Sequence, residues 1–152
     1  MIMAHCRLLF VGGRANLQKI LDNTPDSSSE SAAEIAIGAD WVADYDWITE
    51  EEKKINWTTD NFTKISNPEL YQEVLNGSWY ECFDVRDTNH YGSFDCLNCP
   101  DFEPYDGTNN PKGKENWDVD WDEKEKRNRA RTIEILKTLP DDTLFHFADS
   151  HW

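Results

Sequence analysis

Four side chains in the middle of the chain have the types and spacing of a zinc site. Cys96 and Cys99 form a C-x2-C pair, and Cys82 and His90 lie upstream of it. A structural zinc ion takes four tetrahedral sulfur or nitrogen ligands, and a C-x2-C turn supplies two of them. A second close pair of ligands is missing, so bound zinc and reduced structural thiols both stay open. A redox role is disfavoured, because Pro100 and three acids follow the pair, and acids raise the thiol pKa.

Carboxylates are far more numerous than any other group that could do chemistry. Thirty Asp and Glu stand against fifteen Lys and Arg, which gives a formal net charge of -15. From Ile20 to Glu52 there are ten acids and no Lys, Arg or His. Such a chain repels nucleic-acid backbone and anionic lipid and attracts cationic surfaces. The sequence therefore predicts a basic protein as the partner, with no direct binding to nucleic acid or membrane.

Some of these acids have spacings that would line them up. Asp118, Asp120 and Asp122 would share one face of a strand, about 6.6 Å apart. Asp40 and Asp44 would be neighbours on a helix. Rows of carboxylates can stand in for the closely spaced phosphates of a nucleic acid. The alternative is an acidic face that only keeps the protein in solution.

Tryptophans lie within the acidic tract and suggest where a partner would bind. An interface hot spot is typically a buried aromatic inside a polar rim, although an aromatic among acids can equally belong to the core. The predicted partner-binding surface consists of Asp40, Trp41, Asp44, Asp46, Trp47, Glu50, Glu51, Glu52, Asp118, Asp120 and Asp122.

Catalysis has little support in the sequence. The four His residues are scattered, and no Ser or Cys lies in a nucleophile motif. Gly12-Gly13 is interpreted as a turn and not as a phosphate-binding loop. A basic cluster, Lys124, Lys126, Arg127, Arg129 and Arg131, is expected to pair with nearby acids such as Glu123 and Glu125, or with a second subunit. A homodimer therefore stays open, and we expect no enzyme.

Local patterns indicate the elements that must position these residues. Apolar runs predict strands at 7–11, 79–85 and 143–148. Capping residues and apolar spacing predict helices after Gly13, at 32–37, from Pro68 to about Leu75, and from about Asp122 to Leu139. The chain therefore begins strand–helix and ends helix–strand. We expect one α+β domain over 1–152, with a two-layer, ferredoxin-like antiparallel sheet, helices on one face, and a loop-rich insertion at about 87–114.

Two short segments resemble a known family. The opening stretch from Ala4 to Gly13, with its His-Cys pair, strand, glycine turn and following helix, is similar to the start of the phage and plasmid YubB-like family. The stretch from Glu115 to Trp121 resembles an Asn-Trp-Gly segment of that family, with Asp118 where the family has Gly. The resemblance implies a mobile-element protein with a ferredoxin-like domain, and it carries over no catalytic residue.

These observations favour an acidic, non-enzymatic inhibitor encoded by a phage or plasmid. It would mimic nucleic acid and block a basic host protein such as a CRISPR effector, a restriction enzyme or a repair enzyme. The alternative is an interaction domain stabilised by zinc, and a third is a carboxylate, metal-dependent hydrolase. No apolar run approaches the roughly 20 residues of a membrane span, and no secretory signal is recognised at the N-terminus. We therefore expect a protein of the host cytoplasm.

Overall fold

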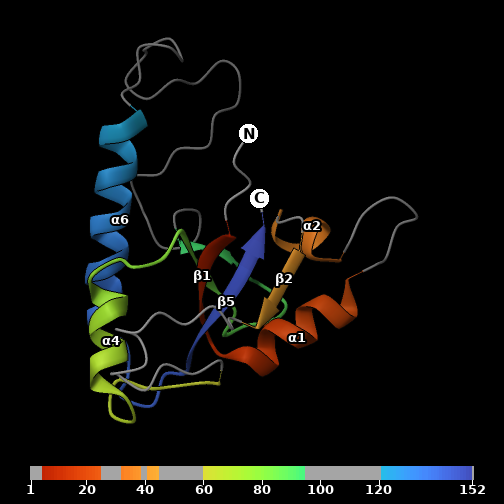
Figure 1. Cartoon of the computed structure of the whole chain (residues 1–152), viewed down its shortest axis with the longest axis horizontal. Coiled ribbons are helices and arrows are strands. Elements are labelled where there is room, and N and C mark those ends of the chain that lie inside the picture. Colours follow the sequence, from red (N-terminus) through yellow and green to blue (C-terminus); the bar gives the residue numbers. More distant parts are fainter. Residues whose placement is uncertain (1–4, 25–31, 39–40, 45–59, 95–120, 152) are drawn as a thin grey trace.

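A mixed five-stranded sheet forms the centre of the molecule (Figure 1). The computed structural model describes residues 5–24, 32–38, 41–44, 60–94 and 121–151. The strands are β1 (His5–Val11), β2 (Trp41–Asp44), β3 (Glu81–Asp84), β4 (Gly92–Ser93) and β5 (Phe145–His151), in the order β2-β5-β1-β3-β4. The helices are α1 (Arg14–Asn23), α2 (Ala32–Ile37), α4 (Pro68–Leu75) and α6 (Trp121–Lys137). The predicted α+β class is confirmed.

The central strand β1 is buried on both of its faces. Leu8, Leu9, Phe10 and Val11 are all fully buried. Side chains alternate along a strand, so Leu8 and Phe10 pack in one cluster and Leu9 and Val11 in another. A strand with a continuous apolar run needs a cover on each side of the sheet.

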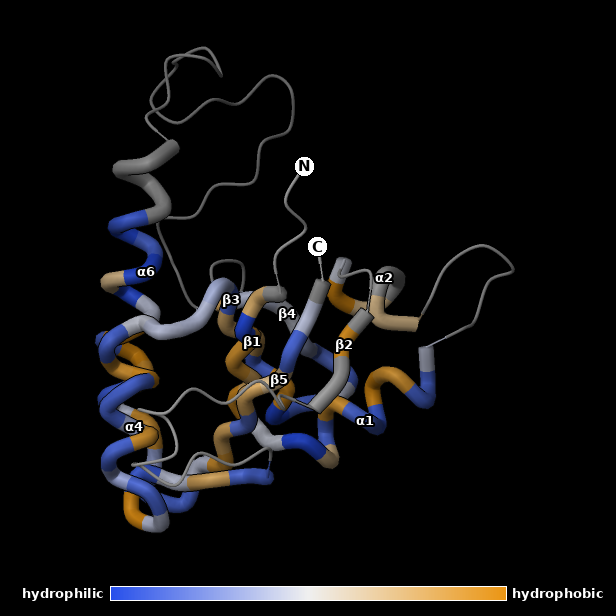
Figure 2. The backbone as a smooth tube through the Cα atoms, viewed as in Figure 1, coloured by the Kyte–Doolittle hydropathy of each residue, from blue (hydrophilic) through white to orange (hydrophobic). Residues whose placement is uncertain are grey.

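Helices supply that cover on both sides, which corrects the expectation of two layers with helices on one face. Leu17 and Ile20 of α1 and Ile37 of α2 pack on the side of Phe10. Val74 of α4 and Leu136 of α6 pack on the side of Leu9. Figure 2 shows the hydrophobic parts of α1 and α4 turned towards the sheet.

The sheet is antiparallel at three of its four strand pairs and parallel at the fourth. β5 pairs antiparallel with both β1 and β2, and β4 pairs antiparallel with β3. β1 and β3 run parallel, with Leu8 opposite Glu81 and Val11 opposite Asp84. Parallel neighbours need a long crossover connection, and here it contains α1, α2, β2 and α4.

Local signals fix the ends of the helices. Asn67 caps α4 by accepting a hydrogen bond from the Leu70 amide, and Pro68 occupies the first turn, as helix starts favour. Gly77, just after α4, has a φ of 72°, a conformation that glycine adopts without strain. The predictions of α2 at 32–37 and of the last helix, expected from Asp122 and observed from Trp121, are confirmed to within a few residues.

Candidate functional site

Most residues of the predicted partner-binding surface lie outside the part of the chain that the structure describes. These are Asp40, Asp46, Trp47, Glu50, Glu51, Glu52, Asp118 and Asp120. Trp41 and Asp44 are the first and last residues of β2, so Asp44 lies on a strand and not on the helix that its spacing from Asp40 suggested. Asp122 lies in the first turn of α6, so it does not continue a strand from Asp118 and Asp120.

The negative charge is distributed unevenly between the described elements and the segments between them. Segments 25–31, 39–40, 45–59 and 95–120 hold fourteen of the thirty acidic residues but only four of the fifteen basic ones. The remaining sixteen acids and eleven bases belong to the described residues. Ten of the fifteen net negative charges thus come from those segments, and the described residues contribute the other five.

The basic cluster of α6 contains two exposed cations and one that is held by the backbone. Lys126 and Arg127 are exposed, and within the described part of the chain neither has an ion-pair partner. Arg129 bonds to backbone carbonyls of the turn before β3, and it has no carboxylate partner among the side chains that the structure describes. The side chains of Glu123 and Glu125 lie outside the part of the chain that the structure describes, so their pairing with the basic cluster stays a prediction.

Two arginines from distant elements hold the turn that leads into β3. Arg129 Nη1 donates to the carbonyls of Gly77 and Trp79 at 2.9 Å each, and its Nη2 donates to the Tyr80 carbonyl at 3.3 Å. Arg7 of β1 donates to the intervening carbonyl of Ser78 at 3.2 Å. The four consecutive carbonyls of residues 77–80 are therefore all bonded to a guanidinium. This contact fixes α4, β3, β1 and α6 relative to one another.

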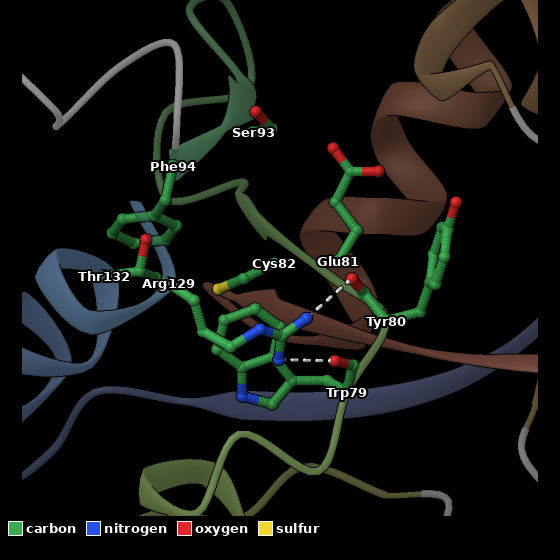
Figure 3. Close-up of a pocket in the computed structure, with 8 residues that line it drawn as sticks. All are labelled: Trp79, Tyr80, Glu81, Cys82, Ser93, Phe94, Arg129 and Thr132. Carbon is green, nitrogen blue, oxygen red and sulfur yellow. Dashed lines mark hydrogen bonds between the residues drawn. The ribbon is translucent and has the colours of Figure 1, made fainter. Parts of the chain in front are cut away.

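The Arg129 guanidinium also lies over the indole ring of Trp79, 4.4 Å from its centroid. Trp79 is buried, and its Nε1 donates to the Val74 carbonyl at 3.0 Å. A guanidinium over an indole face is attracted by the ring quadrupole. The ring therefore forms a fixed platform for Arg129, as Figure 3 shows.

A pocket of about 260 Å³ opens beside this platform (Figure 3). Its walls are residues 79–82, Ser93 and Phe94 of the neighbouring edge, and Arg129 and Thr132 of α6. Phe94 and Thr132 are buried, whereas Tyr80 is 56% exposed at the rim. The pocket thus combines an aromatic wall, hydroxyl groups, a thiol, one guanidinium and the Glu81 carboxylate. Its volume is below the usual range for drug-sized ligands but suits a small polar molecule.

Sequence reasoning missed this pocket, because its walls come from segments separated by up to 53 positions, Trp79 to Thr132. The basic cluster was recognised in the sequence, but nothing in it indicated that Arg129, unlike Arg127, would meet Trp79. A pair of an arginine and a tryptophan so far apart has no local signature.

The two described residues of the predicted zinc site have different surroundings. Cys82 is buried among the core residues that include Leu9 and Phe94. His90 is exposed on a turn, where its Nδ1 lies 3.3 Å from an Asp87 carboxylate oxygen. Among the residues that the structure describes, no three His, Cys, Asp or Glu side chains are grouped as metal ligands. Cys96 and Cys99 lie outside those residues, so the zinc site stays a prediction.

Two ionisable groups near these elements have pKa values shifted by their surroundings. The Asp87 carboxylate accepts a hydrogen bond from the Asn89 amide, which lowers the pKa of Asp87, and His90 contributes a smaller lowering. Burial raises the pKa of the Cys6 thiol, and the negative charge of Asp149 adds to that rise. Cys6 is therefore not an activated thiolate.

The glycine turn after β1 is structural, as the sequence predicts. The Gly12 amide donates to the Leu144 carbonyl at 2.8 Å. The Arg14 amide, at the start of α1, donates to Asn61 Oδ1 at 2.7 Å. A phosphate-binding loop needs such amides to point at the ligand, and here they bond to the protein itself.

Comparisons with known proteins found no match to this chain. No family model, curated protein sequence or solved structure matches the chain. The resemblance to the YubB-like family therefore depends on its two short segments alone. No helix in the described parts of the chain has both the length and the apolar composition needed to cross a membrane.

Proposed function

We propose that the chain is a non-enzymatic, acidic binding protein that occupies the nucleic-acid-binding surface of a basic partner protein. The observation that carries this proposal is the uneven distribution of charge along the chain. Ten of the fifteen net negative charges lie in segments 25–31, 39–40, 45–59 and 95–120, and the described residues carry the other five. Like charges close together cost stability through mutual repulsion, and the cations of a basic partner would offset that repulsion.

Two of these segments join the described elements at the same end of the molecule. Segment 39–40 leads into Trp41, which is in register with His151 at the end of β5. Segment 95–120 leads into Trp121 at the start of α6. Both of these junctions lie towards the end of the molecule at which β5 finishes (Figure 1). In the proposed mechanism, the carboxylates of the acidic segments replace phosphates on the partner's Lys and Arg.

A host nuclease or repair enzyme, such as a CRISPR effector or a restriction enzyme, has the basic groove that this mechanism requires. Electrostatic complementarity of this kind gives fast association that weakens as salt rises.

The test compares two triple variants that remove the same amount of charge. Glu50→Gln, Glu51→Gln and Glu52→Gln together neutralise three acids of segment 45–59. Asp22→Asn, Glu69→Gln and Asp142→Asn neutralise three exposed acids of the body. Partners are captured from a bacterial lysate at low and high salt and identified by mass spectrometry, and the capture is then repeated with competing DNA.

We expect capture of DNA-binding proteins that is lost at high salt and with added DNA, and that is weakened by the first triple variant more than by the second. Capture that does not change with ionic strength, or an equal effect of both variants, would contradict the proposal. Equal effects would mean that only net charge matters.

A further inference from the structure

We infer that the pocket beside Trp79 is a binding site for a small carboxylate, with Arg129 as the residue that binds its two oxygens. This inference is independent of the proposed partner surface, because none of its residues belongs to the acidic segments.

The argument starts from the hydrogen-bond donors of Arg129. A guanidinium carries five N–H groups in one plane. Nη1 uses both of its N–H groups on the carbonyls of Gly77 and Trp79, and Nη2 uses one on Tyr80. Among the described residues, Nε and the second N–H of Nη2 have no partner. Nε and Nη2 lie along one edge of the plane, and an edge of this kind can bind a carboxylate with two parallel hydrogen bonds.

Arg129 is one of the residues that line the pocket, together with Cys82 and Ser93. In Figure 3 the guanidinium lies across the Trp79 ring, and two of its nitrogens are bonded to the Trp79 and Tyr80 carbonyls. The hydrogen bonds and the ring contact hold the guanidinium in place before any ligand arrives. A donor fixed in its binding geometry loses little conformational entropy when the ligand binds.

The charges around the pocket favour a single negative charge. Arg129 has no carboxylate partner in the described part of the chain, and Lys126, Arg127 and Arg131 belong to the same stretch of α6, in which no acid occurs from Lys126 to Ile133. The Glu81 carboxylate at the rim opposes this positive field. It penalises a dianion such as phosphate more than a monocarboxylate, since the repulsion grows with the ligand's charge.

The apolar wall limits the size of the ligand. Phe94 is fully buried and forms one side, and the space of about 260 Å³ lies just below the range usual for drug-sized ligands. Acetate and N-acetylglycine are therefore suitable probes. Ligands this small with one paired charge bind with dissociation constants on the order of 1 mM.

The experiment follows the Nε–H resonance of Arg129 by nuclear magnetic resonance while acetate or N-acetylglycine replaces chloride at constant ionic strength. The resonance is assigned by its loss in Arg129→Lys. We expect a saturable shift of the Arg129 signal and no shift of the Arg127 signal. Ser93→Met, which fills the pocket without touching the bonded carbonyls, should weaken binding at least ten-fold. Arg127→Ala removes an equal charge from the same helix and should leave the affinity within two-fold.

Three results would overturn the inference. The first is the absence of a saturable shift up to about 50 mM probe, well above the expected dissociation constant. The second is unchanged affinity in Ser93→Met, which would place the anion elsewhere. The third is tighter binding of inorganic phosphate than of acetate, which would show that charge and not the carboxylate geometry decides.

Discussion

Removing the Arg129 side chain should destabilise the fold strongly, because one guanidinium joins three elements. Arg129→Ala removes hydrogen bonds to the carbonyls of Gly77, Trp79 and Tyr80 and the contact with the Trp79 ring. A hydrogen bond from a charged donor contributes about 1.5–3 kcal/mol, and a partly buried cation–π contact about 1–2 kcal/mol. The bonds share one side chain and the Tyr80 bond is long, so the terms do not simply add.

We therefore expect Arg129→Ala to lower the free energy of unfolding by about 3–5 kcal/mol, a large part of the roughly 5–15 kcal/mol typical of a domain. The melting temperature should fall by roughly 10 °C. Arg129→Lys keeps the charge near the ring but loses the planar fork, so it should lose about half as much. Urea unfolding followed by circular dichroism measures both variants.

The matched control is Arg127→Ala, which removes an exposed arginine two positions away on the same helix. A surface substitution of this kind should change stability by no more than about 0.5 kcal/mol. If Arg129→Ala stays within about 1 kcal/mol of the wild type, the turn at 77–80 does not depend on this guanidinium. If Arg129→Lys is as stable as the wild type, charge alone suffices and the fork geometry is irrelevant.

Three further outcomes are expected. Gly12→Ala should lower the free energy of unfolding in urea by about 1–3 kcal/mol or more. The reason is that Gly12 has a φ of 124° and a Cβ would lie 2.7 Å from the Arg86 amide nitrogen. An unchanged free energy of unfolding would refute this geometry. The Asp87 carboxyl, titrated by nuclear magnetic resonance, should have a pKa below its ordinary value of about 3.9, and still below it in His90→Ala, because the Asn89 amide is the larger cause. Because its pKa is lowered, Asp87 adds stability at pH values above its ordinary pKa, and this stability is lost as the pH falls through the pKa of the folded state. An ordinary pKa of Asp87 in His90→Ala would mean that the imidazole causes the lowering. Chelator should leave the melting temperature unchanged, because Cys82 packs in the apolar core; bound zinc with unfolding by chelator would instead establish the metal-stabilised alternative.

Local features of the sequence were sufficient to predict most of the helices and strands. The run from Leu8 to Val11, the Asn67-Pro68 helix start and the glycine after α4 each act through contacts within a few residues, so their patterns predicted β1 and α4. The total charge also follows from composition alone. β2 was not predicted, because Trp41–Asp44 is short and lies within a tract where apolar and acidic residues alternate irregularly.

Only the tertiary structure decided how these elements combine. The apolar run of β1 was recognised as a strand, but its cover on both faces became clear only from the packing of α1 and α4 on opposite sides of the sheet. The parallel pairing of β1 with β3 joins residues about seventy positions apart, and no local pattern specifies it. The same holds for Arg129, whose role comes from the carbonyls and the ring that the fold brings to it. Charge and helix ends are local properties of the chain, whereas a pocket depends on which distant segments pack together.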